Sequence, residues 1–472
     1  MTPEKSSDFV AYLRAHLDAN AFVEGANVNP ASVSDGTRVS GFLPSLLLRP
    51  RNAADLSLIL QTATKLRQSV VIQGGLTGLA GGARPRHGEV AVSLERMRGM
   101  SAVNVAEGTI EVEAGVPLQA VQEAAQAAGF MFGVDLGARG SASIGGMIAT
   151  NAGGIRVLRY GMMRDQVAGL EGVLADGTVI DSMLGLPKDN AGYDLRQLLV
   201  GSEGTLGVVT RAKLRLRPAP KSERAALLSL GSVDDAIKLL VFLRERIGDL
   251  LAAFEIIFPD VYAGTIAHMG IVPPLPPGAG LYVLTDIQGQ TPDADLERFQ
   301  AALGDAVEIG LCSDAILSSS GREFETLWAI RDGVSDCVYA QGQSYGFDIG
   351  VPLNAINRFL KLAADRVSAI DPTARAFIFG HLGDGNLHYI VETEEGADIA
   401  KAVLTAVAEA GGTITAEHGI GTDKRDWLHL CRSEAELAVM GRLKRALDPA
   451  GILNPERVIS TSAAYGNKTL LP

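Results

Sequence analysis

Residues 70–82 read Val-Val-Ile-Gln-Gly-Gly-Leu-Thr-Gly-Leu-Ala-Gly-Gly, a short apolar run that passes directly into a loop with five glycines. The apolar half is typical of a buried strand. Glycine lets a backbone approach a ligand closely, and successive N–H groups in such a loop can point at an anion. A flexible surface loop is the alternative interpretation, but the position directly after a buried strand favours a phosphate-binding loop.

The residues around this loop alternate between strand and helix patterns over 46–94. Leu46-Leu47-Leu48 is apolar, and Asn52 followed by Asp55 is a helix start signal. Apolar residues then recur at helical spacing as far as Leu66. The predicted order is strand, helix, strand, glycine loop, strand.

Two more glycine-rich stretches follow. Residues 137–154 combine glycines with other small residues and with Thr150 and Asn151, so they can wrap a large planar ligand without steric conflict. Residues 201–209 read Gly-Ser-Glu-Gly-Thr-Leu-Gly-Val-Val. No Gly-x-Gly-x-x-Gly follows a strand and no Gly-x-x-x-x-Gly-Lys-Ser/Thr occurs, which excludes the dinucleotide fingerprint and the P-loop. A bound phosphate would therefore be held by a different loop design.

Residues 379–388 read Phe-Gly-His-Leu-Gly-Asp-Gly-Asn-Leu-His, and Asp384-Gly385 within them is a hairpin turn signal. A two-residue turn at this point pairs His381 with His388 across two strands, with Cβ atoms about 5 Å apart. Asn386 lies on the same face, because side chains alternate along a strand. The sequence therefore predicts two imidazoles side by side.

A possible third ligand follows at 416–419, which read Ala-Glu-His-Gly. Two imidazoles together with the carboxylate of Glu417 suit a divalent metal. The alternative interpretation is that each histidine is an ordinary hydrogen-bonded polar residue.

The composition is that of a globular protein. The chain has 472 residues, 47% of them apolar and 20% charged, so two or three domains are expected. The formal charge of −12 argues against nucleic acid or an anionic membrane as a main partner. The three cysteines include no Cys-x-x-Cys, which favours a reduced compartment. With no secretory pattern at the N-terminus and no apolar run of spanning length, a cytoplasmic protein without a membrane span is expected.

The second half of the chain has a different pattern. Arg217-Pro218-Ala219-Pro220 predicts a domain boundary. Ala175-Asp176-Gly177 predicts a hairpin before it. Strands are expected at 281–287 and 377–381, and helices at 234–246, 353–369, 398–410 and, in the tail, 433–454.

These glycine strings and the histidine hairpin, in this order, resemble the FAD-dependent D-2-hydroxyacid dehydrogenase family. The family includes D-2-hydroxyglutarate dehydrogenase, D-lactate dehydrogenase and the glycolate oxidase flavin subunit, and it belongs to the vanillyl-alcohol oxidase / p-cresol methylhydroxylase (PCMH) superfamily. The resemblance runs from about Leu48 to Pro455 and is strongest to the D-2-hydroxyglutarate dehydrogenase branch. Its most specific pieces are 153–161, 188–195, 201–207, the histidine hairpin and 416–419.

The resemblance implies an α+β fold. It places a two-subdomain PCMH-type FAD-binding domain at 1–219. A substrate-binding cap domain at 220–422 would be α+β with an antiparallel sheet, and would carry the metal site. A C-terminal helical segment at 423–472 would return to the FAD-binding domain.

FAD is the cofactor that the resemblance implies. The loop at 74–82 would hold the pyrophosphate, 137–154 would lie along the flavin, and 201–208 would pass near the adenine and isoalloxazine. Covalent members often carry a histidine where this chain has Gly75-Leu76-Thr77, so the FAD is expected to be non-covalent. The implied cofactor-binding residues are Gly74, Gly75, Leu76, Thr77, Gly78, Gly81, Gly82, Gly137, Ser141, Gly145, Gly146, Thr150, Asn151, Gly153, Gly154, Glu203, Gly207, Val208 and Asn454.

The resemblance further implies that His381, His388 and Glu417 bind zinc or manganese. A divalent metal lowers the pKa of a substrate hydroxyl. His418 would take the hydroxyl proton as general base, and the Cα hydride would pass to flavin N5. The alternative role for His418 is to orient its neighbours by hydrogen bonding.

The implied substrate-binding residues are Arg331, Ser335, Asn386 and Tyr345. The Arg331 guanidinium would bind the substrate carboxylate, and Asn386 would hydrogen-bond the substrate. The chain departs from the family at Gly346, where a lysine usually helps to hold a distal carboxylate. That departure puts a dicarboxylate substrate in doubt and leaves room for a larger or less charged group.

The expected activity is oxidation of a D-2-hydroxy acid to the 2-oxo acid, with electrons passed to an electron-transfer flavoprotein, a quinone, a cytochrome or oxygen. A non-redox flavoenzyme of the alkyl-dihydroxyacetone-phosphate synthase type is one alternative, and a glycolate or D-lactate oxidase-type subunit is another. A catalytically silent binding protein is the third, and the intact set of His381, His388, Glu417 and Arg331 argues against it. The resemblance is also compatible with a homodimer.

Overall fold

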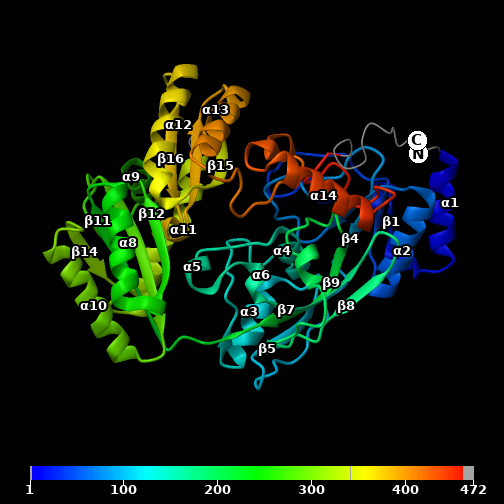
Figure 1. Ribbon diagram of the computed structural model, residues 1–472, viewed down its shortest axis with the longest axis horizontal. Helices are drawn as coiled ribbons and strands as arrows, with labels where there is room; N and C mark the ends of the chain where they lie inside the picture. Colours follow the sequence, from blue (N-terminus) through cyan, green and yellow to red (C-terminus); the bar gives the residue numbers. More distant parts are fainter. Residues whose placement is uncertain (1–2, 341, 461–472) are drawn as a thin grey trace. The chain divides into compact units, whose positions relative to one another are not determined.

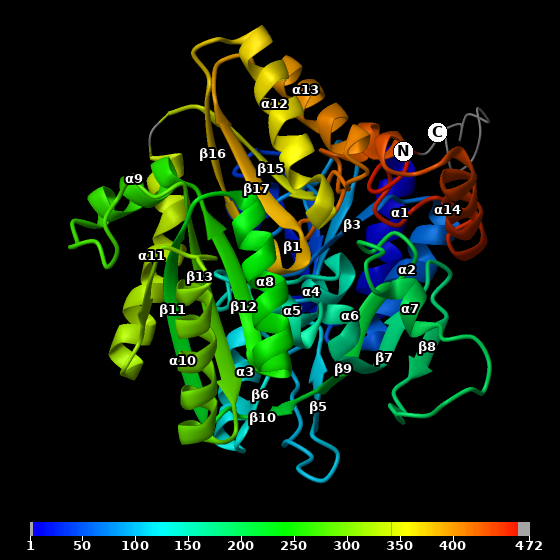
Figure 2. The same cartoon turned by 60° about the vertical axis from the view of Figure 1, so that its left-hand side comes forward.

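The computed structural model describes residues 3–340 and 342–460, and the chain divides into two compact units. Unit 1 is built from Met1–Gly153, Met162–Pro218 and Glu417–Pro472, and unit 2 from Gly154–Gly161 and Ala219–Ala416. Figures 1 and 2 show the elements of both from two directions. The C-terminal segment therefore belongs to the same unit as the glycine loop.

The first sheet of unit 1 leads into the glycine loop. Its strand order is β1-β2-β4-β3, in which β4 is parallel to both β2 and β3. Helix α2 connects β2 to β3 and begins at Asn52, whose side chain accepts a hydrogen bond from the Asp55 N–H at 2.9 Å. The order predicted from the sequence is confirmed. The elements are α1 (Pro3–Arg14), β1 (Phe22–Glu24), β2 (Leu46–Leu48), α2 (Ala53–Leu66), β3 (Val70–Gln73) and β4 (Val90–Ser93).

The second sheet of unit 1 is antiparallel, with strand order β5-β9-β7-β8. The predicted hairpin at 175–177 joins β7 to β8, and Gly177 takes the left-handed φ of +88° that glycine tolerates without strain. The strands β6 and β10 form a separate antiparallel pair. The remaining helices and strands of unit 1 are β5 (Thr109–Glu113), α3 (Leu118–Ala127), β6 (Phe130–Met131), α4 (Ile144–Thr150), α6 (Met163–Gln166), β7 (Val167–Val173), β8 (Val179–Ser182), α7 (Arg196–Leu199), β9 (Val208–Arg215), β10 (Arg217–Pro218) and α14 (Glu434–Leu447).

The prediction of a tail helix over 433–454 is wrong at its C-terminal end. Helix α14 ends at Leu447, and the chain then turns back along β3. The Asp448 carboxylate accepts hydrogen bonds from the N–H groups of Ile452 and Leu453, and Leu453 pairs with Val70 in parallel. If the helix continued over residues 448–454, both sets of contacts would be lost.

Unit 2 contains a seven-stranded antiparallel sheet of order β14-β11-β13-β12-β16-β17-β15. Apolar residues of β11, β12 and β13 form a core with α9 and α11 on one face. Helices α8 and α10 cover the other face, and α12 lies beside α13 (Figure 2). The elements are α5 (Val157–Tyr160), β11 (Ser222–Leu230), α8 (Val233–Ile247), β12 (Leu251–Ile257), α9 (Pro259–Met269), β13 (Leu281–Gly289), α10 (Pro292–Glu308), β14 (Asp314–Leu317), α11 (Gly321–Tyr339), β15 (Ser344–Gly350), α12 (Ile356–Ile370), β16 (Arg375–Gly380), β17 (Asn386–Glu392) and α13 (Gly396–Glu409).

The histidine hairpin is present as β16 and β17, but the predicted register is wrong. His388 lies opposite Phe379 rather than His381. The connection contains a 3₁₀ turn, Leu382–Asp384, closed by Gly385 at a left-handed φ of +82°, so it is longer than a two-residue turn. The imidazoles of His381 and His388 still meet, with ring centroids 5.4 Å apart and ring planes at 79°.

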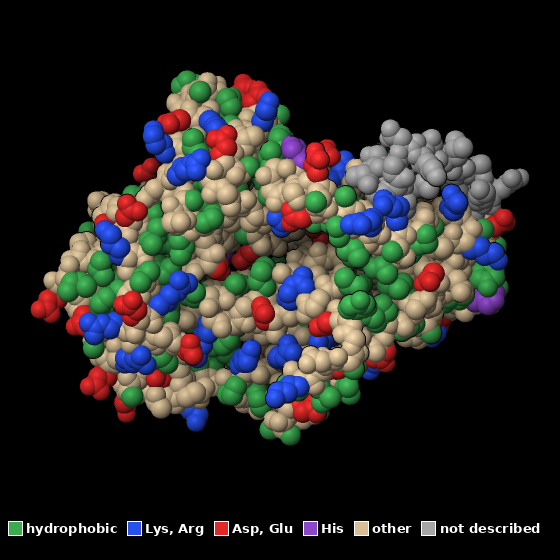
Figure 3. Space-filling model, in the orientation of Figure 1, with side chains coloured by type: hydrophobic (Ala, Val, Ile, Leu, Met, Phe, Trp, Pro, Cys, Tyr) green, Lys and Arg blue, Asp and Glu red, His purple; other side chains and the backbone are tan. Residues whose placement is uncertain are grey.

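Across residues 3–340 and 342–460, none of the helices is both long and apolar enough to cross a bilayer. On the face seen in Figure 3, Lys and Arg side chains are interspersed with Asp and Glu side chains.

Candidate active site

The glycine loop after β3 forms one wall of a cavity of ≈ 410 Å³ in unit 1. The rest of the wall comes from 136–153, from Glu203, from Glu417 and His418, and from Asn454. All of these residues belong to unit 1. A concave, largely apolar cavity with a few converging polar groups is typical of a cofactor site.

Two glycines of the loop pack closely against the segment before α4. A Cβ on Gly74 would lie 2.5 Å from the Ser143 Oγ, and one on Gly75 would lie 1.9 Å from the Ser141 carbonyl oxygen. Ser143 is also the N-cap of α4, where its Oγ accepts from the Gly146 N–H at 3.4 Å. The backbone clash at 75 admits no side chain, and a side chain at 74 would have to displace the Ser143 hydroxyl, so this close-packed wall fits a cradle for the pyrophosphate of FAD.

Most of the residues predicted to bind the cofactor line this cavity. The lining set includes Gly74, Gly75, Leu76, Thr77, Gly78, Gly82, Gly137, Gly146, Thr150, Gly153, Glu203 and Asn454. The other predicted residues do not line it: Gly81, Ser141, Gly145, Asn151, Gly154, Gly207 and Val208. Gly154 belongs to unit 2, and Gly145 instead packs against Ala114, whose Cβ would be 2.6 Å from a Cβ at 145.

Glu203 fixes the backbone that follows His418. Its carboxylate oxygens accept hydrogen bonds from the N–H groups of Ile420 and Gly421, both at 2.7 Å. Burial raises the pKa of the Glu203 carboxyl, and these two donors act in the opposite direction. The Glu203 backbone takes a left-handed φ of +50°, which is uncommon for a residue with a side chain. Glu203 thus connects two walls of the cavity.

In unit 2, Glu255 joins two of the predicted site residues. Its Oε1 lies 2.6 Å from Nδ1 of His381, and its Oε2 accepts a hydrogen bond from Nε of Arg331 at 2.6 Å. Burial alone would raise the pKa of this carboxyl, but His381 and Arg331 bring it down to about 2. Arg331 also lies over the Phe379 ring, with its guanidinium carbon 5.0 Å from the centroid. These contacts fix the orientations of the His381 ring and the Arg331 guanidinium.

Asp348 lies near the second histidine, His388, and it also contacts Asn386 and the backbone before Glu417. Its Oδ1 lies 4.0 Å from Nδ1 of His388 and accepts a hydrogen bond from Nδ2 of Asn386 at 2.8 Å. Its Oδ2 accepts from the N–H of Ala416 at 3.2 Å, immediately before Glu417 in the chain. The 2.6 Å contact of His381 with Glu255 is a hydrogen bond of the kind that orients metal-binding imidazoles in proteins, whereas the 4.0 Å between Asp348 and His388 is the separation of a loose ion pair.

The remaining predicted substrate residues lie on α11 and β15. Ser335 is one turn after Arg331 in α11. The hydroxyl of Tyr345 accepts a hydrogen bond from Nε2 of Gln343 at 2.6 Å, and its ring packs against Gly396. A Cβ at Gly346 would lie 2.6 Å from the Tyr339 hydroxyl, so this position has little room for a side chain.

The three predicted metal ligands are divided between the units. His381 and His388 belong to unit 2 and Glu417 to unit 1. In the part of the chain that the structure describes, no group of three or more His, Cys, Asp or Glu side chains is arranged to hold a metal ion.

The sequence interpretation missed Glu255 and Asp348. Glu255 lies in the strand Leu-Ala-Ala-Phe-Glu-Ile-Ile, in which every residue is buried. A lone carboxylate in an otherwise apolar strand is the signal that could have revealed it, because buried charges need partners.

Comparison with known families identifies the two halves of the chain. Residues 44–182 match the FAD binding domain family, and residues 219–458 match the family described as FAD linked oxidases, C-terminal domain. The D-2-hydroxyglutarate dehydrogenase of Xanthomonas citri pv. viticola is 36% identical over 434 residues, which cover 90% of this chain and 91% of that protein. The mitochondrial D-2-hydroxyglutarate dehydrogenase of Bos taurus is 36% identical over 464 residues, covering 97% of this chain and 84% of that protein.

Solved structures share the fold at low sequence identity. p-Cresol methylhydroxylase with bound substrate superposes with a TM-score of 0.77 at 15% identity, over 98% of each chain. The 4-ethylphenol oxidase of Gulosibacter chungangensis gives a TM-score of 0.74 at 19% identity, over 97% of this chain and 98% of that one. The expected PCMH-type architecture and the family resemblance are thus confirmed. The chain belongs to the FAD-linked oxidase family and is an FAD-dependent oxidoreductase.

Proposed function

We propose that this protein oxidises a D-2-hydroxy acid to the corresponding 2-oxo acid and passes the electrons to an external acceptor. The observation that carries the proposal is the composition of the unit 1 cavity. Glu417 and His418 line the same cavity as the glycine loop of a matched FAD-binding domain. Relatives that are named D-2-hydroxyglutarate dehydrogenase and cover most of the chain indicate the substrate class.

The proposed reaction needs a hydride acceptor and a group that acidifies the substrate hydroxyl, and these two functions are assigned to FAD and to a divalent cation. FAD, when bound, supplies the ring that accepts the hydride from Cα of the substrate. A divalent cation held by His381, His388 and Glu417 would supply a Lewis acid that lowers the pKa of the substrate hydroxyl. The donor set suits zinc or manganese, because it combines two imidazoles with one carboxylate.

The substrate carboxylate is assigned to Arg331. Its Nε is occupied by Glu255, so the guanidinium is held in one orientation. The terminal pair of N–H groups can then bind a carboxylate bidentately. Because Glu255 has a pKa of about 2, it stays ionised at neutral pH and keeps this orientation.

Asn386 is assigned to the substrate hydroxyl. Its Nδ2 donates to Asp348 and to the Ile349 carbonyl, at 2.8 and 3.0 Å. Its buried Oδ1 has no hydrogen-bond partner among the residues that the structure describes. A buried acceptor without a partner costs free energy, which a donor such as a hydroxyl would recover. Ser335, an exposed residue one turn after Arg331 in α11, is assigned to the substrate only as a second polar group on the same helix.

His418 is assigned the proton of the substrate hydroxyl. A neutral imidazole is a suitable base near pH 7. The hydrogen bonds from Ile420 and Gly421 to Glu203 fix the backbone two and three residues beyond it, so its ring is carried on an ordered segment.

The far end of the substrate is expected to be neutral, unlike the second carboxylate of 2-hydroxyglutarate. The extra room expected from Gly346 is not part of the proposal, because the Tyr339 hydroxyl would lie 2.6 Å from a Cβ at that position. Gly346 provides no cation, and Tyr345 and Gln343 hydrogen-bond each other. This part of the proposal separates the protein's preferred substrate from that of the named relatives.

The test is a substrate screen with an artificial electron acceptor. Purified holoenzyme is assayed with the D and L forms of lactate, malate, 2-hydroxyglutarate and larger aliphatic and aromatic 2-hydroxy acids, and the product is identified as the 2-oxo acid. Turnover of D enantiomers, with a neutral side chain preferred over a distal carboxylate, is the expected result. Absence of dye reduction with every D-2-hydroxy acid would contradict the proposal.

A further inference from the structure

We propose that Arg457 is a positioning residue for FAD. Its side chain holds the far limb of the glycine loop, residues 82–89, against the C-terminal segment. This limb leads from the loop into β4. Neither Arg457 nor its partner Glu89 lines the cavity, so the proposed role is exerted through the loop.

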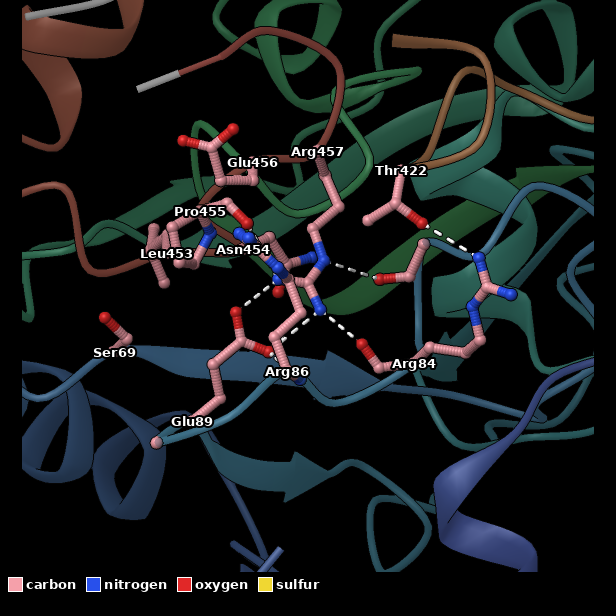
Figure 4. Close-up of polar contacts among 12 residues, drawn as sticks. Ser69, Arg84, Arg86, Glu89, Thr422, Leu453, Asn454, Pro455, Glu456 and Arg457 are labelled. Carbon is pink, nitrogen blue, oxygen red and sulfur yellow. Dashed lines mark hydrogen bonds and ion pairs between the residues drawn. The ribbon is translucent and has the colours of Figure 1, made fainter. Parts of the chain in front are cut away.

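Arg457 is almost completely enclosed, with 1% of its surface exposed. Figure 4 shows its guanidinium pointing at the loop limb. Its Nε donates to the Gly82 carbonyl at 3.3 Å, and its Nη2 donates to the Arg84 carbonyl and, at 2.9 Å, to the Glu89 carboxylate. Its Nη1 donates to the other Glu89 oxygen and to the Pro455 carbonyl. One side chain thus contacts three points of the limb.

The same segment also holds the start of the loop. The Asn454 Oδ1 accepts from the Ile72 N–H at 2.8 Å, and its N–H donates to the Val70 carbonyl at 3.0 Å. Its Nδ2 donates to the Glu203 carbonyl at 2.7 Å. Residues 454–457 therefore hold both ends of the glycine loop, and Arg457 is responsible for the far end.

The backbone that presents Arg457 is itself strained. Asn454, Glu456 and Val458 all have left-handed φ values, of +41°, +63° and +62°. This region is unfavourable for residues with side chains, and most of all for a β-branched valine. Such a conformation persists only where surrounding contacts impose it, and strained backbone of this kind concentrates at functional sites.

The ion pair and the carbonyl contacts can be separated experimentally. A buried ion pair can often be replaced by two apolar residues of similar size without loss of stability, whereas removing one partner leaves an uncompensated charge. An apolar side chain at 457 cannot donate to the carbonyls of Gly82 and Arg84, and one at 89 cannot accept the hydrogen bond that the Glu89 carboxylate takes from the Arg86 N–H at 2.8 Å. Replacing both partners should therefore loosen the loop while preserving the fold.

The experiment compares Arg457→Met/Glu89→Leu and Arg457→Lys with the wild-type chain. Leu56→Ala serves as the matched control, since Leu56 is fully buried in α2 and touches the core of the same sheet rather than the loop limb. The holoproteins are deflavinated, and two quantities are measured: the Kd for FAD, by fluorescence titration, and the Tm of the apoprotein.

We expect the double variant to keep an apoprotein Tm close to that of the wild type while its Kd for FAD rises about tenfold or more. Arg457→Lys should show an intermediate Kd, because an ammonium cannot reproduce the planar array of donors. Leu56→Ala should lower Tm and leave the Kd within about twofold.

An unchanged FAD affinity in the double variant would overturn the proposal. So would a Kd that simply follows Tm across all the variants, Leu56→Ala included, because Arg457 would then be a structural residue only. If the double variant does not fold, the comparison of Arg457→Lys with Leu56→Ala decides the question by the same two measurements.

Discussion

The Oε1 atom of Glu255 lies 2.6 Å from Nδ1 of His381, and its other oxygen is bonded to Arg331. One buried carboxylate thus orients both a proposed metal ligand and the proposed carboxylate-binding residue. With Nδ1 directed at Glu255, Nε2 is the ring nitrogen that would bind a metal.

Replacing Glu255 by glutamine should weaken metal binding. The amide keeps the size of the side chain but removes the charge that orients His381, and loss of such a partner typically lowers metal affinity 10- to 100-fold. Metal content and the Kd for Zn²⁺ and Mn²⁺ can be measured directly on the purified variant. FAD occupancy should be unchanged, and a metal affinity equal to the wild type would refute the proposed role of Glu255.

Replacing Arg331 by lysine should lower kcat/KM for every 2-hydroxy acid. A lysine cannot bind a carboxylate bidentately, and a hydrogen bond to a charged group contributes about 1.5–3 kcal/mol, or roughly 10- to 150-fold. Arg246→Lys is the control, because Arg246 is an exposed arginine of α8 that pairs with Asp305 and lies over the Phe242 ring. Equal kinetic constants for the two variants would remove Arg331 from substrate binding.

Alanine at Gly75 should destabilise the apoprotein, whereas alanine at Gly78 should not. The new Cβ at 75 would lie 1.9 Å from the Ser141 carbonyl oxygen, but the one at 78 would have no protein atom within 4 Å. Overpacking of this kind costs about 1–3 kcal/mol. Urea unfolding of the two apoproteins gives the free energies of unfolding, and similar values would mean that the loop packs differently against 141–143.

Replacing His388 by alanine should abolish the proposed metal binding without removing FAD. The variant deletes one of two proposed imidazole ligands, while the cavity lined by the glycine loop lies in unit 1 and contains no part of β17. Metal analysis of the purified variant tests the loss of metal binding, and the flavin absorbance of the same sample tests the retention of FAD. Full turnover by metal-free His388→Ala with bound FAD would exclude a metal from the reaction.

The sequence predicted the elements that depend on local patterns. Asn52 starts α2 and Gly177 closes its hairpin, because capping and turn preferences act over a few residues. The register of the histidine hairpin was missed because the conformations of Gly380 and Gly385, at φ of +144° and +82°, extend the connection. Nothing local distinguishes that connection from a two-residue turn.

The sequence could not predict contacts between distant parts of the chain. Glu255 and His381 are 126 residues apart, and Arg457 and Glu89 are 368 residues apart. The first pair depends on β12 lying beside β16 in the sheet of unit 2. The second depends on the return of the C-terminal segment along β3, which the helical periodicity of the tail did not indicate.

The most direct test of the account is the reduction of the bound flavin by substrate. The holoprotein is mixed anaerobically with a D-2-hydroxy acid and then, separately, with its L enantiomer, and the flavin absorbance in the blue is recorded without any added acceptor. Bleaching by the D form alone, with one 2-oxo acid formed for each flavin reduced, is the predicted result. A flavin that stays oxidised with every D-2-hydroxy acid would contradict the account.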